Sequence, residues 1–234
     1  MSAPLHMVQM RLDAAALMRF AADQRLDLRQ DEDSGYALHA WLAAMFGTDA
    51  PKPFRWFEHK AEVLGYAACD HRALSERAQA FANPIAHVAL LPGALHSKIM
   101  PGVWTAGQRL KIEVLACPVS RRGTTEKDVY LRELDRLGDA ARAREAVYLD
   151  WFRSQWADAV AFEALALRGI ARSRTLRRGR AENKRTSRMV ERPRALFNGV
   201  VAVRDGNRFQ ELVQRGIGRH RAFGYGMVLL APPS

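Results

Sequence analysis

Residues 216–226, with the sequence GIGRHRAFGYG, combine residue types that can bind a phosphate group. The four glycines of this segment are Gly216, Gly218, Gly224 and Gly226. Glycine adopts positive φ angles and lets the backbone approach a ligand closely. Arg219 and Arg221, with His220 between them, add side-chain donors to the main-chain N–H groups, and this combination suits phosphate. The spacing is neither that of a Walker P-loop nor that of a dinucleotide fingerprint. The alternative interpretation is a tight helix-to-strand connection that needs glycine for packing.

A second basic feature occupies residues 168–194, which contain eleven arginines and lysines but only two acids. The flanks of this tract have an extended pattern and its centre is polar, which predicts a basic β-hairpin. Arginine binds phosphate through two parallel hydrogen bonds, so we expect the hairpin to contact a nucleic-acid backbone. The side chains expected to do so are Arg172, Arg174, Arg177, Arg178, Arg180, Lys184, Arg185 and Arg188. The alternative for the tip is a solvated loop.

The composition agrees with a polyanionic partner. The chain of 234 residues has a net charge of +11, and 48% of its residues are hydrophobic, enough to form a core. A merely basic protein without such a partner remains the alternative. We see neither a signal peptide nor an apolar run long enough to span a membrane, so we expect a cytoplasmic protein. Cys69 and Cys117 have no metal-binding spacing, and we expect interior thiols and no metal or cofactor.

The two halves of the chain predict similar orders of helices and strands, and these must position the glycine-rich segment and the basic hairpin. The first half predicts strands at 7–12, 54–58 and 62–68, helices at 13–24, 35–46 and 71–82, an extended segment at 86–91 and a loop at 92–104. The second half predicts strands at 108–119, 195–203 and 227–231, extended segments at 162–175 and 187–190, a helix at 126–158 that Gly138 can break, and a helix at 208–215. This order predicts an α+β fold of two tandem ferredoxin-like βαββαβ domains, at residues 1–100 and 105–234.

The glycine-rich segment resembles the corresponding loop of the repeat-associated RNA-binding (RAMP) superfamily of CRISPR systems. Other segments resemble one branch, the CasE-type endoribonucleases of type I-E systems. They are LACPV at 115–119, LFNGVVAV at 196–203, ELVQRGIG at 211–218 and MVLLAP at 227–232. The similarity is strong near the C-terminal end and diffuse elsewhere. It implies an enzyme that binds the hairpin of CRISPR repeat RNA, cuts at its base and stays in the effector complex (Cascade) with other subunits.

The resemblance also implies a catalytic pair on an early helix. A Tyr-x-x-His pattern in the family matches Tyr36 and His39 here, and the i, i+3 spacing places both side chains on one helical face. The implied chemistry is attack of a ribose 2′-OH on the adjacent phosphorus, with an imidazole as general base or general acid. No metal is needed, because the nucleophile belongs to the RNA. Without the resemblance, the two side chains would be interpreted as packing residues.

The sequence departs from the family at one point. Some members carry a lysine shortly after the histidine, where this chain has Ala43, Ala44 and Met45. A cation that stabilises the phosphorane must therefore come from elsewhere. The candidates are Lys98, Arg19, Lys52 and the arginines of residues 216–226.

The sequence leaves two other functions open. One is a non-catalytic RNA-binding scaffold subunit of a CRISPR complex, with an inert Tyr36 and His39. The other is a basic DNA-binding protein, although no helix-turn-helix pattern supports it. Cleavage of a repeat hairpin in EDTA that is lost in His39→Ala would separate the enzyme from both.

Overall fold

The computed structural model describes residues 4–26, 34–181 and 184–233, and it describes the side chains of these residues except at 173–190. The chain divides into two compact units. The N-terminal unit comprises Met1–Gly102 and Arg221–Met227, and the C-terminal unit comprises Val103–His220 and Val228–Ser234. The predicted domains differ from this division chiefly at Arg221–Met227, a short segment near the C-terminus that packs with the N-terminal unit.

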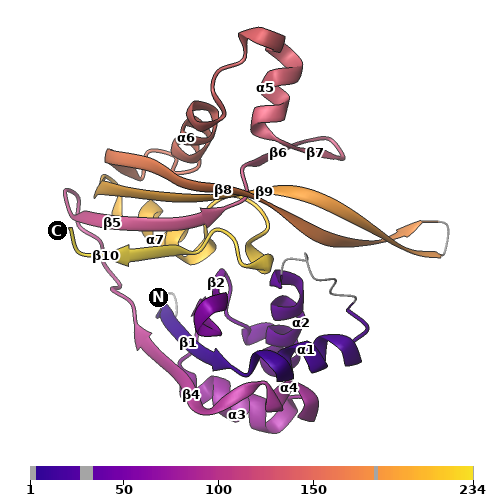
Figure 1. Cartoon of the computed structure of the whole chain (residues 1–234). Helices are drawn as coiled ribbons and strands as arrows, with labels where there is room; N and C mark the ends of the chain where they lie inside the picture. Colours follow the sequence, from indigo (N-terminus) through magenta and orange to yellow (C-terminus); the bar gives the residue numbers. More distant parts are fainter. Residues whose placement is uncertain (1–3, 27–33, 182–183, 234) are drawn as a thin grey trace. The chain divides into compact units, whose positions relative to one another are not determined.

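The N-terminal unit is a ferredoxin-like domain (Figure 1). Its four antiparallel strands lie in the order β2-β3-β1-β4. They are β1 (His6–Leu12), β2 (Phe54–Phe57), β3 (Glu62–Ala67) and β4 (Leu90–Ile99). Val8, Met10 and Leu12 alternate with more exposed residues along β1 and are buried. This period of two gives the sheet one apolar face, which the helices cover.

The helices of this unit are α1 (Ala14–Asp23), α2 (Gly35–Phe46), α3 (His71–Phe81) and α4 (Pro84–Val88). Short 3₁₀ turns lie at η1 (Gly47–Asp49), η2 (Glu58–Lys60) and η4 (Arg221–Phe223). The core face of α2 includes Trp41, whose indole Nε1 donates to the carbonyl of Ala86 at 2.8 Å. Gly47, at a φ of 57°, ends α2 as the sequence predicts.

The C-terminal unit is a second ferredoxin-like domain with strand order β10-β5-β9-β8. Its strands are β5 (Arg109–Ala116), β8 (Val160–Ala181), β9 (Lys184–Val203) and β10 (Val228–Ala231), with a separate hairpin of β6 (Val119–Arg122) and β7 (Thr125–Asp128). Its helices are α5 (Val129–Leu137), α6 (Arg144–Ser154) and α7 (Gly206–Arg215), and η3 (Gly138–Ala140) follows α5. Strands β8 and β9 form one long ribbon, paired from Val160 with Val203 to Ala181 with Lys184. The predicted basic hairpin is thus an extension of the sheet.

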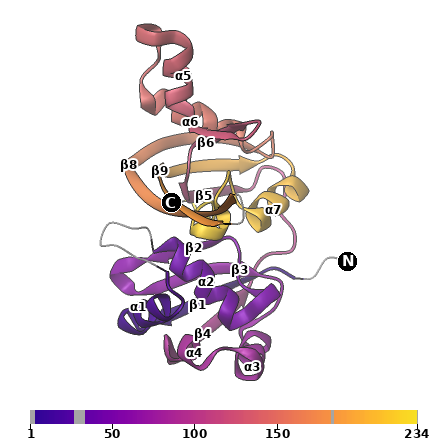
Figure 2. The ribbon, with the colours of Figure 1, turned by 90° about the vertical axis from the view of Figure 1, so that its right-hand side faces the viewer.

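Aromatic rings form the centre of the C-terminal unit. Phe152 of α6 stacks on Phe197 of β9 with ring centroids 4.3 Å apart, and Trp156 packs against Phe209 of α7 at 6.1 Å. The first contact attaches α6 to the sheet, and the second joins α7 to the segment that follows α6. Figure 2 shows α5 farther from the sheet than α6.

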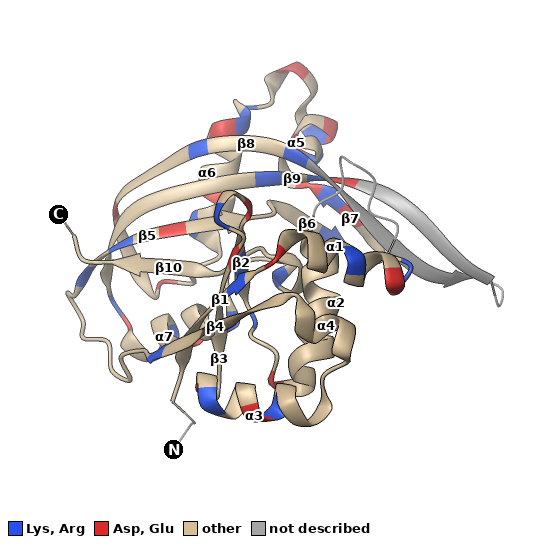
Figure 3. Cartoon of the chain, turned by 60° about the horizontal axis from the view of Figure 1, so that its bottom comes forward, with Lys and Arg blue, Asp and Glu red and all other residues tan. Residues whose placement is uncertain are grey.

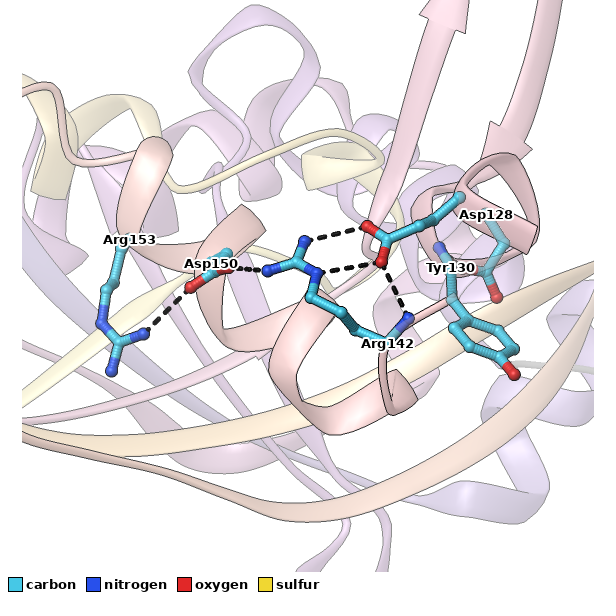
Figure 4. A network of polar contacts seen from close by, with 6 residues as sticks. Asp128, Tyr130, Arg142, Asp150 and Arg153 are labelled. Atoms are coloured by element: carbon cyan, nitrogen blue, oxygen red, sulfur yellow. Dashed lines mark hydrogen bonds and ion pairs between the residues drawn. The ribbon is translucent and has the colours of Figure 1, made fainter. Parts of the chain in front are cut away.

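An ion-pair network ties α5 to α6 (Figure 4). The Arg142 guanidinium donates to both Glu133 oxygens at 2.8 and 2.9 Å, and its third nitrogen donates to Asp150 at 2.5 Å. The backbone N–H of Arg142 also donates to Glu133 at 3.1 Å, and Arg153 contacts Asp150 at 3.2 Å. The network joins two helices that the turn at Gly138, with a φ of 54°, separates.

Three element predictions are wrong. Residues 84–88 form α4, because Asn83 caps the helix by accepting from the N–H of Ile85 at 2.9 Å and Pro84 suits the first turn. The predicted loop at 92–104 is largely strand β4. Pro92 is tolerated there because β4 is an edge strand and its pairing with β1 shifts register near that point. Residues 126–128 belong to β7, and Asp128 begins α5 by capping the N–H of Tyr130.

Candidate active site

Tyr36 and His39 lie on the same partly exposed face of α2, and both contact the aromatic ring of Phe223. The Tyr36 ring stacks on Phe223 with centroids 6.0 Å apart, and the His39 ring meets it edge-on at 5.4 Å. All three residues belong to the N-terminal unit, because η4 packs against α2. The His39 imidazole is half-buried, so part of the ring is accessible at the surface of the N-terminal unit. It can therefore meet a substrate.

The surroundings of His39 favour the neutral imidazole. Burial lowers the pKa of His39 below its usual value, and the nearby positive charge of Lys52 lowers the same pKa further. A neutral ring at pH 7 can accept a proton. Lys52 is exposed, and its backbone N–H donates to the carbonyl of Tyr66 at 2.7 Å, which fixes the start of its side chain. The sequence analysis named several lysines and arginines that could stabilise the phosphorane. Among them, Lys52 is the one whose positive charge acts on the pKa of His39.

Phe223 contacts both residues of the candidate pair, and the sequence analysis did not single it out. It occupies η4, inside the glycine-rich segment. The next residue, Gly224, has a φ of 87°, and a Cβ at this position would lie 3.4 Å from the Phe54 ring. The backbone therefore passes close to β2 before it turns back. An aromatic residue between two pairs of glycines was the available signal, but nothing in the sequence shows which ring it meets.

The glycines of residues 216–226 all have positive φ angles: 79° at Gly216, 74° at Gly218, 87° at Gly224 and 80° at Gly226. Packing explains part of this pattern. Gly216, Gly224 and Gly226 are buried, and a Cβ on Gly218 would lie 3.0 Å from the Trp151 indole. The packing role that the sequence left open is therefore present. Contact of these glycines with RNA stays a prediction.

A carboxylate that the sequence analysis did not consider holds the preceding turn. Glu126 of β7 lies 2.8 Å from Arg219 Nε, 2.8 Å from His220 Nε2 and 3.2 Å from Arg192 of β9. Burial alone would raise the pKa of Glu126, but His220, Arg219 and Arg192 lower it to about 2. Burial and the charge of Arg192 lower the pKa of His220, against the opposing effect of Glu126. Two of the predicted RNA-binding side chains, Arg219 and His220, are thus oriented by one acid.

The basic ribbon is only partly described. Arg172 is exposed and lies 3.4 Å from Glu191 across the strand pair. The other seven predicted contacts lie outside the described side chains, although the backbone around them is strand. They are Arg174, Arg177, Arg178, Arg180, Lys184, Arg185 and Arg188. Figure 3 marks the lysines and arginines of the described parts of β8 and β9. Arg221 is partly buried in η4.

The described residues show no group of three or more His, Cys, Asp or Glu side chains that could hold a metal ion. A cavity of about 470 Å³ lies beside β6 and α5. None of its lining residues is a predicted site residue. They are Ser120, Arg122, Val129, Arg132, Glu133, Asp135 and Arg136. In the part of the chain that the structure describes, no helix is long and apolar enough to cross a membrane.

A family model described as "CRISPR associated protein" matches residues 5–232. The chain belongs to this family of CRISPR-associated proteins. No curated protein sequence matches the chain significantly. The resemblance seen in the glycine-rich segment is therefore confirmed at the level of the family and over nearly the whole length of the chain.

Solved structures of other CRISPR proteins have the same fold. The CRISPR endoribonuclease Cse3 bound to a 19-nucleotide RNA aligns with a TM-score of 0.63 at 17% identity, over 98% of this chain and 100% of that chain. Thermus thermophilus Cse3, bound to an RNA that represents a pre-cleavage complex, gives 0.60 at 16%, over 98% and 100%. Cas6e from Escherichia coli K-12 gives 0.51 at 16%, over 98% and 99%. These similarities support the two ferredoxin-like domains of this CRISPR-associated protein.

Proposed function

We propose that the chain is a metal-independent endoribonuclease that binds the stem-loop of CRISPR repeat RNA and cleaves it at the 3′ base of the stem. The observation that carries the proposal is His39, a half-buried imidazole with a lowered pKa that lies beside Tyr36 and within the electrostatic influence of Lys52. Membership in the CRISPR-associated family and a fold shared with RNA-bound Cse3 support the choice of substrate.

The reaction would be an internal transesterification. The 2′-oxygen forms a bond to the adjacent phosphorus, the bond from phosphorus to the 5′-oxygen breaks, and the upstream fragment ends in a 2′,3′-cyclic phosphate. His39 acts as general base by accepting the 2′-OH proton, or as general acid by protonating the departing 5′-oxygen. The lowered pKa of His39 favours the first role at neutral pH, since the ring is then unprotonated. Such a group contributes about 10²–10⁴-fold to the rate.

Lys52 and Tyr36 would support the charge that develops at phosphorus. A lysine ammonium placed beside the reacting phosphate stabilises the phosphorane, and this electrostatic contribution is often the largest in an active site. The Tyr36 hydroxyl can donate to a non-bridging oxygen or position the 2′-OH. In this proposal Lys52 takes the place of the lysine that some members of the family carry on the helix and that this chain lacks.

The ribbon of β8 and β9 and the glycine-rich segment would hold the stem. A-form RNA hides its base edges in a narrow major groove, so the arginines should contact mainly phosphates. Each such contact adds about 0.7–0.9 to the slope of log affinity against log salt. The RNA-binding residues are those named from the sequence, with Arg172 and Arg219 both exposed in the described structure.

The proposal includes retention of the cleaved RNA and assembly into a type I-E effector complex. A chain of a CRISPR RNA-guided surveillance complex in its pre-nicking state aligns with a TM-score of 0.57 at 16% identity, over 97% of this chain and all of that chain. Retention predicts that the stem-loop product stays bound after cleavage and limits turnover.

The test is cleavage of a repeat hairpin RNA in EDTA, followed on denaturing gels. We expect the wild-type protein to cut once at the base of the stem, and we expect a 2′-deoxy substitution at the scissile nucleotide to abolish the cut. His39→Ala should slow cleavage about 10²–10⁴-fold while hairpin affinity is kept. The matched control is His59→Ala, which removes an exposed imidazole from η2 and should cleave normally.

If His39→Ala cleaves like the wild type, the catalytic assignment is wrong. If the wild-type protein binds the hairpin but never cuts it, the chain is a non-catalytic RNA-binding scaffold. Tight binding of duplex DNA with no preference for the hairpin would instead favour the DNA-binding alternative.

A further inference from the structure

Glu126 is the centre of a charge cluster that joins three separate parts of the C-terminal unit. It lies on β7, Arg192 lies on β9, and Arg219 and His220 lie in the turn that follows α7. The Glu126 side chain is 14% exposed, that of Arg192 is 9% and that of His220 is 11%. Arg219 is the open member of the cluster at 43%.

Both carboxylate oxygens of Glu126 are engaged. Oε1 contacts His220 Nε2 at 2.8 Å and Arg192 at 3.2 Å, and Oε2 accepts from Arg219 Nε at 2.8 Å. Burial lowers the pKa of His220, so its neutral ring donates Nε2–H to the carboxylate. With a neutral His220, one negative charge faces two arginines, and the cluster keeps one excess positive charge. The excess positive charge is accessible to solvent at Arg219, the most exposed side chain of the cluster.

The geometry of Arg219 leaves its outer edge able to bind an anion. The contact with Glu126 runs through Nε. A guanidinium held in this way still presents its two terminal nitrogens, the edge that binds a phosphate with parallel hydrogen bonds. An arginine side chain loses considerable rotamer freedom when it is fixed, so an arginine already held by an acid loses less on binding RNA.

The backbone of the turn also depends on this contact. His220 has a φ of 61°, a left-handed conformation that is uncommon for residues other than glycine. Such a conformation persists only where surrounding contacts compensate for its cost. The contact between the His220 ring and Glu126 is one of these contacts, and it holds the residue next to Arg219 in place.

We propose that Glu126 is a positioning residue for RNA binding, which holds Arg219 in the orientation that receives a phosphodiester of the repeat RNA. The inference rests on the proposed function, since it requires that the protein bind RNA. It assigns a favourable role in RNA binding to an acid, although the negative charge of an acid by itself repels the ligand.

The charge of Glu126 and its proposed positioning role predict opposite changes in RNA affinity, so one variant can distinguish them. By charge alone, Glu126→Gln removes a negative charge near the RNA and should tighten binding and steepen the salt dependence. If Glu126 positions Arg219, the same variant should bind about tenfold more weakly, the loss expected for one charge-assisted hydrogen bond. Its salt slope should fall by about 0.7–0.9, the contribution of one phosphate contact.

The experiment measures the Kd of a repeat hairpin with a 2′-deoxy scissile nucleotide at several salt concentrations, on the full chain. The matched control is Glu145→Gln, which removes the charge of an exposed acid on α6 and should bind as tightly as wild type or slightly more tightly. In a double-mutant cycle, Glu126→Gln should add little to Arg219→Gln, because both changes remove the same contact. Thermal unfolding of each variant, recorded in parallel, ensures that only folded protein is compared.

Glu126→Asp gives a second test that keeps the charge. The shorter side chain draws the carboxylate back from Arg219, so positioning predicts weaker binding where charge alone predicts no change. Wild-type or tighter affinity in both Glu126→Gln and Glu126→Asp overturns the inference. Absence of hairpin binding by the wild-type protein would instead overturn the proposed function, so the two failures are distinguishable.

Discussion

Replacing Phe223 with alanine tests whether the glycine-rich segment orders the catalytic pair. The centroid of the Phe223 ring lies 6.0 Å from that of Tyr36 and 5.4 Å from that of His39. These two ring contacts connect η4 with α2. Phe223→Ala removes both ring contacts and leaves the proposed chemical groups in the protein. At saturating protein, any effect on the cleavage rate must therefore come from the position or the environment of Tyr36 and His39.

The size of the effect follows from the two ring contacts. An aromatic pair contributes about 0.5–1.5 kcal/mol beyond its burial, so the two pairs contribute about 1–3 kcal/mol. If about half of this free energy orders the imidazole for reaction, the loss is about 0.5–1.5 kcal/mol, which corresponds to a rate lower by about 2–13-fold. We expect the rate to fall about fivefold at saturating protein, where a change in RNA affinity has no effect.

The pH dependence should change as well. Burial lowers the pKa of His39, and loss of the Phe223 ring exposes the imidazole, so the pKa should rise toward its usual value of 6.5. If His39 is the general base, the rate falls as pH drops through this pKa, and that acidic limb should move to higher pH. If His39 is the general acid, the alkaline limb should move to higher pH.

The assay is single-turnover cleavage of the repeat hairpin between pH 5 and 9. Phe81→Ala is the matched control, because Phe81 is 77% exposed at the end of α3 and has no place in the proposed site. A folded Phe223→Ala protein with the wild-type rate and the wild-type pH profile would refute the reasoning, because the contact would then contribute nothing to catalysis.

Three further predictions concern other parts of the structure. Lys52→Gln removes a charge that lowers the pKa of His39, so the same limb of the single-turnover pH profile should move to higher pH and the maximal rate should fall about 10–100-fold; an unchanged profile would exclude Lys52 from the site. Gly218→Ala places a Cβ 3.0 Å from Trp151 at a φ of 74°, and urea unfolding should show a loss of about 1–3 kcal/mol, whereas equal stability would mean that the turn relaxes freely. Arg142→Gln removes the donors that join the carboxylates of α5 and α6, so hydrogen exchange should speed up in α5 and stay unchanged in the central strands, and equal exchange in α5 would show that packing alone holds this helix.

The sequence by itself determined most of the elements and the family. Helix α2 begins at Gly35 and ends at Phe46, as predicted, because its apolar pattern and the glycine that follows are local signals. The alternation along β1 and β5 likewise marked their buried faces. Local signals were insufficient where strand pairing overrides the conformational preference of a residue. Pro92 is an example, because it lies in an edge strand only through the pairing of that strand with β1.

Only the tertiary structure decided which side chains meet. Phe223 reaches Tyr36 and His39 because η4 packs with the N-terminal unit, a long-range contact that no local pattern encodes. Glu126 likewise meets Arg219 from 93 residues away in the sequence, and its place in the short, charged strand β7 gives no signal of this contact. The periodicity of apolar residues shows which face of a helix or strand is buried. Which side chains from distant parts of the sequence come into contact depends on the tertiary fold of the whole chain.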